Sequence, residues 1–490
     1  QYFLLLNFVL TMWWWEISFL LSVLVVFWLL PRLRFFYFTP KSFPPGPRNY
    51  NFILGQTQEI FGSPPCAPQI RWARTYGDVV GYWFFLGAKR VLITDPEAMK
   101  RVLVTNSKNY AKPRRQIRMF RQVVGEGLLA TEGDQHKRQR KGSSPAFRHE
   151  NLKDFIGTFA EKTLILVKKW KALTANGTAE IEMCGALKSL TLDIIGVTAF
   201  GYEFDAQSDV PNKMVESYRH CLDSAGFSLI NFIPFVNRLP FGKNKRSRIA
   251  FQNMRAKVEE LIELEKSKME KSKNLLGGLI DASENFSQKE LVDQILTFMI
   301  AGHETTSVGL CWTFYLLSSH PKVVETVRDE LHSVLGSDPI RVPTFEDMAN
   351  LPYLCALVKE SLRLYPPAPL TQRECLQDDK LGGYDIPAGT IVCVCPGALH
   401  RMSHLYEDPD EFRPERWLTD RKRHPLAWLP FLAGHRSCIG SRFALLEMQT
   451  ILAVLLPLFT LKLAPNCKVV PKLRVTLQPS PDLPMLLSRA

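Results

Sequence analysis

The feature that most constrains the fold is one long apolar helical pattern in the second half of the chain. The segment "SQKELVDQILTFMIAGHETTSVGLCWTFYLLSSHP" begins with Ser287 and Glu290 at capping-box spacing, and Pro321 marks its end. Its interior is nearly all apolar, so we expect this helix to be buried in the body of the protein. With 490 residues and 46% hydrophobic composition, the chain can form the large core that such burial needs.

The rest of the body is predicted to be mainly helical with a minor sheet. Helical periodicity dominates from about residue 150 to 365. "DVVGYWFFL" and "KRVLIT" predict two strands joined through Gly87 and Ala88, and only short β signals return between Tyr384 and Cys395. We therefore expect an α+β fold that is mainly α, with a single large body over residues 51–490.

The N-terminal segment differs in kind from the rest of the chain. Trp13–Leu30 reads "WWWEISFLLSVLVVFWLL", which is close to the ~20 apolar residues of a bilayer-spanning helix. Basic residues follow it, so the positive-inside rule places the body in the cytosol. A cleaved signal peptide is the alternative, but a basic n-region and a small-residue cleavage site are missing. We expect a single-pass membrane anchor at residues 1–34, then a stiff proline-rich connector at 35–50 that contains "FPPGPR".

Charge and cysteine content narrow the classes of partner. The formal net charge is +13, which suits an anionic membrane surface or an acidic protein, while no nucleic-acid motif accompanies it. The ten cysteines are dispersed and contain no CxxC pair, a pattern that favours a reducing compartment. Cys393 and Cys395 could form part of a metal site, although packed strand cysteines explain them better.

The segment Phe227–Arg248 is apolar with two prolines and then strongly basic. It is either a loop packed on the core beside a solvated charge run, or a membrane contact with apolar residues inserted and basic residues at the headgroups. The sequence favours neither interpretation.

Polar residues interrupt the long apolar helix at "AGHETT", Ala301–Thr306. A glycine inside a helix costs about 1 kcal/mol relative to alanine, and a buried glutamate costs more unless it is paired or protonated. The cluster is either a packing glycine with satisfied polar groups or a ligand notch with a proton relay.

Four further patterns have common structural explanations when taken singly. Glu360 and Arg363 in "KESLRLYPP" lie three residues apart on one helix face, and "EFRPERW" supplies Arg416 as a second candidate partner. "EGDQHKRQRK" places His136 and Arg140 one helical turn apart. "FLAGHRSCIG" sets Cys438 on a glycine-bearing loop before a helix, where N–H groups and the helix dipole stabilise a thiolate.

Together, these motifs resemble the cytochrome P-450 family of haem-thiolate monooxygenases. The resemblance runs in order through "PPGP", "GDQHKRQR", "AGHETT", "ESLR", "FRPERW" and "FLAGHRSCIG". The last motif matches the family pattern F-x-x-G-x-R-x-C-x-G at every fixed position. The resemblance implies a cytochrome P-450 fold, with residues 51–490 as the catalytic domain and haem b as the cofactor.

The resemblance also implies a role for each matching residue. Cys438 would be the axial ligand of the haem iron, and Gly434 and Gly440 would let the backbone approach the porphyrin. Ala301 and Gly302 would leave room for dioxygen, and Glu304 and Thr305 would form the acid–alcohol pair that feeds protons to it. Glu360, Arg363 and Arg416 would be a structural triad. The remaining expected haem contacts are Phe431, Arg436, Arg140, Arg373 and His136, the last at a position where the family usually has tryptophan.

The implied reaction inserts one oxygen atom of O2 into a C–H bond of an apolar compound. The chain has no flavin or NADPH fingerprint, so the electrons would come from NADPH–cytochrome reductase, with cytochrome b5 as a further candidate donor. The implied location is the endoplasmic reticulum membrane, with the catalytic domain in the cytosol.

Within the family, the motifs look most like cholesterol 24-hydroxylase and its neighbours, and fatty-acid ω-hydroxylases come second. We therefore expect a sterol or another long apolar lipid as the substrate. Two alternatives stay open. One is a haem-thiolate isomerase or dehydratase that rearranges a peroxide without external electrons, and the other is a haem-binding membrane protein without turnover.

Overall fold

The computed structural model describes most of the chain. The described residues are 13–14, 16–26, 42–48, 51, 53–210, 212–225, 242–270, 272–282, 284, 286–336 and 341–490. Most of the segment Phe227–Arg248 lies outside them, so its predicted membrane contact is not placed by the structure.

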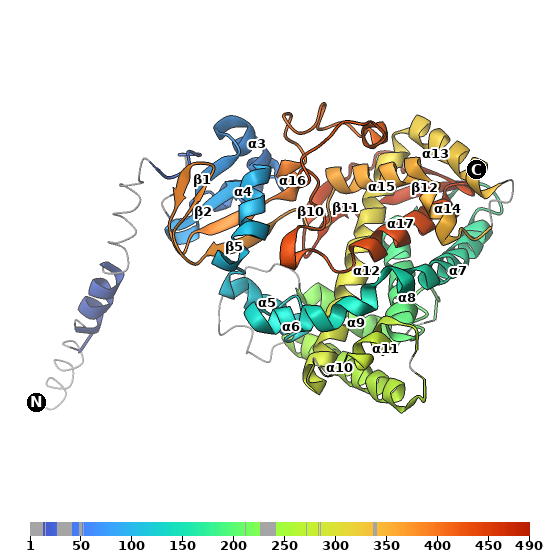
Figure 1. The fold of residues 1–490 in the computed structure, drawn as a ribbon, viewed down its shortest axis with the longest axis horizontal. Helices are drawn as coiled ribbons and strands as arrows, with labels where there is room; N and C mark the ends of the chain where they lie inside the picture. The colour runs from blue at the N-terminus through green and yellow to red at the C-terminus, as the bar shows by residue number, and fades with distance from the viewer. Residues whose placement is uncertain are drawn as a thin grey trace, which may run out of the picture.

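Helices make up most of the body, as predicted (Figure 1). In chain order they are α2 (Thr57–Gly62), α3 (Ala67–Tyr76), α4 (Pro96–Lys100), α5 (Arg114–Val124), α6 (Gly133–Ser143), α7 (His149–Leu173), α8 (Met183–Phe200), α9 (Lys213–Ala225), α10 (Gly242–Ser267), α11 (Leu275–Asp281), α12 (Gln288–Ser318), α13 (Pro321–Leu335), α14 (Phe345–Ala349), α15 (Pro352–Leu364), α16 (Pro396–Leu399) and α17 (Ser441–Leu455).

The predicted apolar helix is α12, which has 31 residues. Its capping box is present: the Ser287 side chain accepts from the Glu290 N–H, and the Glu290 carboxylate accepts from the Ser287 N–H. The helix ends at Ser318, and Pro321 instead begins α13, where a proline needs no hydrogen-bond donor.

The sheet part is larger than the sequence indicates. The strands are β1 (Val79–Phe84), β2 (Ala88–Ile93), β3 (Tyr110–Ala111), β4 (Ala179–Glu182), β5 (Thr371–Cys375), β6 (Asp379–Leu381), β7 (Tyr384–Ile386), β8 (Ile391–Val394), β9 (Phe459–Leu463), β10 (Val470–Leu473), β11 (Leu477–Ser480) and β12 (Pro484–Arg489). The predicted hairpin β1–β2 and the strand β8 are confirmed. The structure adds strands outside residues 384–395, among them β12, which pairs with the distant β4 and with β9.

Within the described residues, the strands form one main sheet and three smaller ones. The main sheet has the order β1-β2-β8-β5-β3, and only the β2–β8 pair is parallel. It lies at one end of the molecule, beside α3, α4 and α16, while most helices gather at the other end (Figure 1). Cys393 and Cys395 are buried in this part, and the described residues contain no group of three or more metal-ligating side chains.

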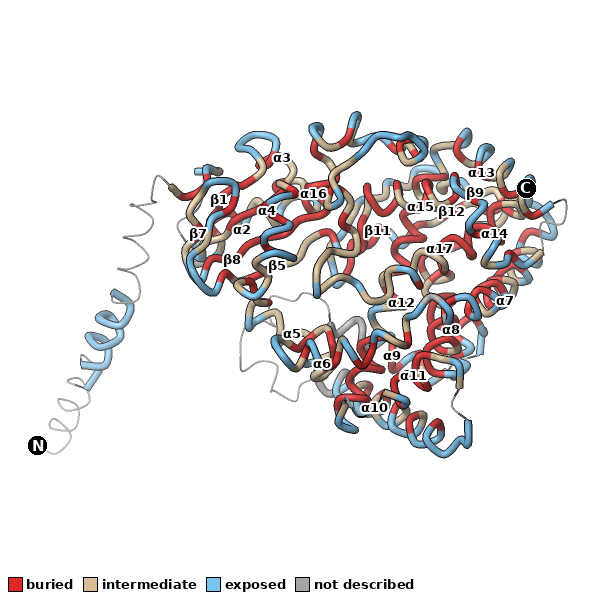
Figure 2. The backbone as a smooth tube through the Cα atoms, in the orientation of Figure 1, coloured by how far each residue is buried: buried red, intermediate tan, exposed pale blue. Residues whose placement is uncertain are grey.

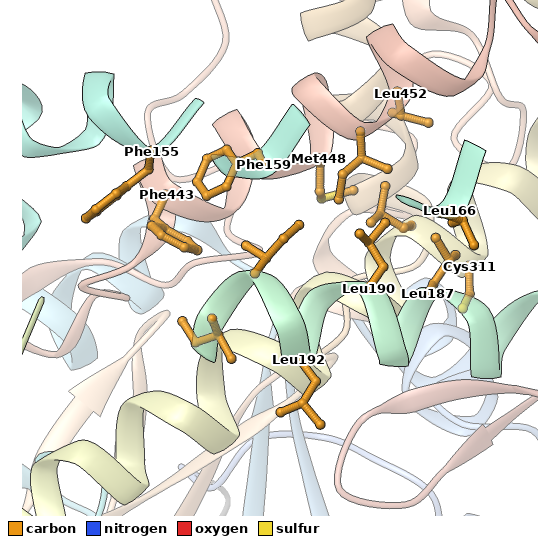
Figure 3. Close-up of a cluster of buried hydrophobic side chains, with 14 of the residues drawn as sticks. Phe155, Phe159, Leu166, Leu187, Leu190, Leu192, Cys311, Phe443, Met448 and Leu452 are labelled. Atoms are coloured by element: carbon orange, nitrogen blue, oxygen red, sulfur yellow. The ribbon is translucent and has the colours of Figure 1, made fainter. Parts of the chain in front are cut away.

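The main core lies where α7, α8, α12 and α17 meet. The Phe443 ring of α17 packs edge-to-face on the Phe159 and Phe155 rings of α7, at centroid distances of 5.0 and 5.9 Å. Figure 3 shows this aromatic group continuing into leucines of α8 and toward Cys311 of α12. The packing holds α12 and α17 in a fixed relation.

The N-terminal segment contains an apolar helix over Glu16–Val26. Figure 2 shows this helix exposed along its length, away from the body. It covers eleven of the residues in the predicted membrane anchor, and the remainder of that anchor is described only at Trp13 and Trp14. These eleven residues form a shorter apolar helix, and among the described residues only α8 is long and apolar enough to cross a bilayer, but α8 is mostly buried in the core. The division into anchor, connector and catalytic domain stays a prediction.

Candidate active site

Cys438 lies on the loop between a 3-10 turn at Gly434–Arg436 and the start of α17. Its N–H donates to the carbonyl oxygen of Phe431 at 2.8 Å, which closes the loop. Gly434 has φ = +72°, and a Cβ there would collide with the carbonyl oxygen of Leu103. Glycine is therefore required at this position, and the turn that it permits leaves the Cys438 side chain exposed.

The electrostatics of Cys438 differ from the expectation drawn from its loop. Although part of its surface is exposed, Cys438 is surrounded by protein that desolvates the thiol and raises its pKa, and the Gly440 N–H and the Arg140 guanidinium only partly oppose this rise. Desolvation thus outweighs the loop N–H groups and the helix dipole, and the protein alone favours the neutral thiol. A metal ion at the sulfur would reverse this balance, because a coordinating thiol is deprotonated.

The helix α12 borders an open space at the predicted ligand notch. Ala301 is exposed and Gly302 and Thr305 are partly exposed, whereas most of the helix before and after them is buried. The Thr305 hydroxyl donates to the Ala301 carbonyl oxygen at 2.6 Å. A Cβ on Gly302 would lie 2.8 Å from Cδ1 of Ile195, so this glycine also allows α8 to pack closely on α12.

Glu304 points away from the neighbouring Thr305. Its carboxylate is buried and accepts hydrogen bonds from the Thr476 hydroxyl, at 3.1 Å, and from the Gln478 side-chain amide. These two residues belong to the β10–β11 hairpin. The carboxylate is therefore satisfied by the hairpin, and its role beside Thr305 stays a prediction.

Buried cations gather beside the Cys438 loop. Arg436 pairs with Glu132 at 2.6 Å between Nη2 and Oε2, and Arg373 is 3% exposed. Lys112, which donates to the Leu129 carbonyl oxygen, is also buried. Burial and the charges of Arg436 and Arg373 lower the pKa of Lys112 to about 7. Burial is also the main cause that lowers the pKa of Arg373 to about 10, and Arg436 adds to it.

The residues present fit a haem. The cation cluster, defined as Lys112, Arg373 and Arg436, has Glu132 as its nearby carboxylate, so it holds more positive than negative charge in a buried place. Buried charges are costly unless they are paired. Within the described part of the chain, Nη1 of Arg436 is buried without a hydrogen-bond partner. Two propionate groups would supply the missing negative charge and an acceptor for this nitrogen.

The histidines and Arg140 line the same loop. His136 of α6 is buried, and burial followed by the charges of Arg436 and Lys112 lowers its pKa to about 3. Its ring meets the His435 ring edge-to-face at a centroid distance of 5.9 Å. Nη1 of Arg140 donates to the Ser437 carbonyl oxygen at 2.6 Å, so Arg140 holds the backbone next to the cysteine. Its predicted propionate contact stays a prediction.

For Phe431 and Gly440, the contacts within the polypeptide do not by themselves indicate a haem. The Phe431 ring packs edge-to-face on the Trp428 ring at 5.9 Å. A Cβ on Gly440 would be 3.8 Å from the Phe147 ring, which is ordinary van der Waals contact. Nothing in the polypeptide therefore requires glycine at 440, and its predicted role depends on the haem.

The structure brings Glu360, Arg363 and Arg416 together. Nε and Nη2 of Arg363 donate to the Glu360 carboxylate at 2.9 and 2.8 Å, and Nε of Arg416 donates to it at 2.8 Å. All three residues are buried. Although burial alone would raise the pKa of Glu360, Arg363 and Arg416 hold it below its usual value. The group links α15 to the segment that contains Arg416.

Sequence reasoning missed three residues of these groups: Lys112, Glu132 and Trp417. The Trp417 indole N–H donates to Glu360 at 2.9 Å and so adds a fourth residue to the structural triad. Trp417 stands directly after Arg416 in "EFRPERW", so the motif that supplied Arg416 could also have indicated Trp417. Lys112 carries no such signal, because it lies in "AKPRR", more than 300 residues before the Cys438 loop.

Comparison with known proteins shows the family to which the chain belongs. The family model described as cytochrome P-450 matches residues 40–485. Cytochrome P-450 monooxygenase 205 of Postia placenta is 32% identical over 86% of this chain and 86% of its own length. Cytochrome P-450 734A1 of Arabidopsis thaliana is 31% identical over 96% of both chains. Cytochrome P-450 monooxygenase sphH of Aspergillus fumigatus is 31% identical over 87% of this chain and 84% of its own length. The chain therefore belongs to the cytochrome P-450 family, the haem-thiolate monooxygenases.

Proposed function

We propose that Cys438 binds the iron of haem b and that the exposed stretch of α12 at Ala301, Gly302 and Thr305 forms the opposite, oxygen-binding side of the pocket. The observation that carries this proposal is the buried cation cluster, whose excess positive charge lies next to the loop of an exposed cysteine. Haem-bound iron with a thiolate ligand supplies the cleavage of O2 and the oxidation of a C–H bond.

The residues of the chain have separate tasks in this proposal. Lys112, Arg373 and Arg436 hold the propionates and neutralise their charge. Thr305 presents a hydroxyl at the partly exposed stretch of α12 and would pass protons to dioxygen held there. Glu304 is the acid that supplies protons to Thr305. It breaks its hydrogen bond to the Thr476 hydroxyl when it delivers a proton.

The substrate and the membrane location are further parts of the proposal. An exposed apolar helix at Glu16–Val26 supports a membrane anchor, for which we propose the endoplasmic reticulum. A lipid or sterol-like substrate suits an enzyme held at a membrane. The net charge of +13 supports docking of an acidic electron donor, for which we propose NADPH–cytochrome reductase, with cytochrome b5 as a second donor.

The test of the relay is Thr305→Ala in the full chain, reconstituted with reductase. We expect the ratio of product formed to NADPH oxidised to fall by up to about 100-fold, the lower end of the contribution of a general acid–base group. The matched control is Thr313→Ala on the same helix, whose hydroxyl bonds to the Gly309 carbonyl oxygen at 2.8 Å. Equal coupling in the Thr305 and Thr313 variants would remove Thr305 from the relay.

A further inference from the structure

His303 lies inside the notch sequence but on the side of α12 away from the open space. It is 3% exposed, between the partly exposed Gly302 and the buried Glu304. Nε2 of His303 is 2.9 Å from the Lys188 carbonyl oxygen of α8, and Nδ1 is 3.0 Å from the Tyr218 hydroxyl of α9. The ring thus connects α12 to two other helices at the turn that bears the candidate relay.

The tautomer of His303 follows from these partners. A carbonyl oxygen only accepts, so Nε2 carries the proton and donates to Lys188. Burial lowers the pKa of His303 to about 4, although the Glu304 charge opposes this shift. The ring is therefore neutral near pH 7, which leaves Nδ1 as an acceptor, and the Tyr218 hydroxyl donates to it.

Tyr218 is as buried as its partner. It is 1% exposed, and its ring meets the imidazole edge-to-face at a centroid distance of 5.1 Å. The hydroxyl also lies 3.2 Å from the Met299 carbonyl oxygen, one turn before His303 on α12. A single hydroxyl of α9 therefore contacts both the backbone and a side chain of the same stretch of α12.

Three consecutive side chains leave this turn in three directions. His303 is held by α8 and α9, Glu304 by the β10–β11 hairpin, and Thr305 bonds to its own helix at Ala301. The helical backbone fixes the angle between successive residues. Rotation of the turn at His303 would therefore move Glu304 and Thr305 with it.

We propose that His303 and Tyr218 are positioning residues that fix the rotation of the α12 turn bearing Glu304 and Thr305. Through them, the placement of α9 sets the geometry of proton delivery at the open face. The neutral imidazole exchanges no proton with the substrate or the bound oxygen. This inference rests on the proposed relay role of Thr305.

The test compares Tyr218→Phe, His303→Leu and His303→Gln in the full, haem-loaded chain. Tyr218→Phe removes one hydroxyl and keeps the ring. Glutamine can donate to Lys188 and accept from Tyr218, so it is the conservative replacement for histidine. The control is Tyr315→Phe, which removes a hydroxyl from α12 about three turns away.

Two readouts are needed. The first is the ratio of product to NADPH oxidised, and the second is amide hydrogen exchange of residues 299–307. We expect Tyr218→Phe and His303→Leu to lower the coupling ratio and raise the exchange about fivefold, the equivalent of one neutral hydrogen bond. His303→Gln and Tyr315→Phe should behave like the wild type, and haem content should stay constant in all variants.

The inference is overturned if Thr305→Ala uncouples the enzyme while Tyr218→Phe leaves both readouts unchanged. It is also overturned if His303→Gln is as impaired as His303→Leu. If Thr305→Ala stays coupled, the proposed relay fails, and the exchange readout alone decides whether the pair holds the turn. Should His303→Leu fail to fold, Tyr218→Phe still gives both readouts.

Discussion

At the residue scale, the buried ionisable groups near the site have opposite electrostatic characters. One group carries an excess of positive charge that favours binding of an anionic ligand, namely the cation cluster of Lys112, Arg373 and Arg436. Glu447 of α17 is instead a buried carboxyl, and neither of its oxygens has a hydrogen-bond partner within the described residues. Burial raises the pKa of Glu447 well above its usual value, and the nearby Thr306 hydroxyl, which does not reach hydrogen-bond geometry, offsets this only in part. Glu447 is thus held as the neutral acid.

This protonation predicts a pH dependence of stability. The proton of Glu447 is kept in the folded state and lost in the unfolded state above a carboxyl pKa of about 4.3. Its contribution is therefore fully present below that pH and declines as the pH rises toward the folded pKa. Glu447→Gln removes this dependence. The melting temperature of the variant should therefore rise relative to that of the wild type as the pH increases from about 4.3 toward neutrality. Parallel pH profiles of the two melting temperatures would show that Glu447 is ionised in the fold.

The site residues that could be predicted best from the sequence are those that lie within a short motif. The spacing around Cys438 and around Glu360 marked both groups, and the structure brings Arg416 to the same carboxylate as Arg363. The direction of Glu304 could not be predicted. Its partners Thr476 and Gln478 lie on a hairpin about 170 residues away, and no local pattern records such a contact.

At the element scale, α15 is joined to the following segment by charge as well as by apolar packing. Glu360 accepts from Arg363, Arg416 and Trp417, and also from the Arg413 N–H at 3.0 Å. A single buried carboxylate thus anchors two arginines and the chain that surrounds them. Loss of its charge would leave two guanidinium groups buried without their partner.

Glu360→Gln is therefore expected to destabilise the fold by about 3–5 kcal/mol, the cost of breaking a buried ion pair by removing one partner. The measurement is the temperature at which haem is released, followed at the Soret band. The control, Glu407→Gln, removes an exposed carboxylate that pairs with Arg413 at 3.3 Å, and should cost about 0–1 kcal/mol. Equal release temperatures for the two variants would contradict this role of the triad.

Elements were predictable where local signals are strong. The hairpin β1–β2 and the capping box of α12 depend on residues close together in the sequence, and both are present. The strands β9 to β12 were missed because they are short, and β10, β11 and β12 each contain a proline. In addition, β12 pairs with β4, which lies about 300 residues away.

At the scale of the whole molecule, two packed helices determine the site. α12 crosses the body and α17 begins just after Cys438, and both pack in one core with α7 and α8 (Figure 3). Ala301, Gly302 and Thr305 in the middle of α12, and Cys438 on its loop, are left at least partly uncovered by this core, and these are the residues proposed to face the haem. The fold class and the burial of α12 followed from hydrophobic pattern alone. The exposure of Ala301 within this buried helix did not, because it depends on how side chains from several segments pack.

The central claim is that Cys438 provides the thiolate ligand of the haem iron. The most direct measurement is the difference spectrum of the dithionite-reduced full chain with and without carbon monoxide, compared for the wild type, Cys438→Ser and the control Cys467→Ser. We predict the red-shifted Soret band of a thiolate-ligated haem in the wild type and in Cys467→Ser, and its loss in Cys438→Ser. A wild type that binds haem without this band, or a Cys438→Ser variant that keeps it, would contradict the account.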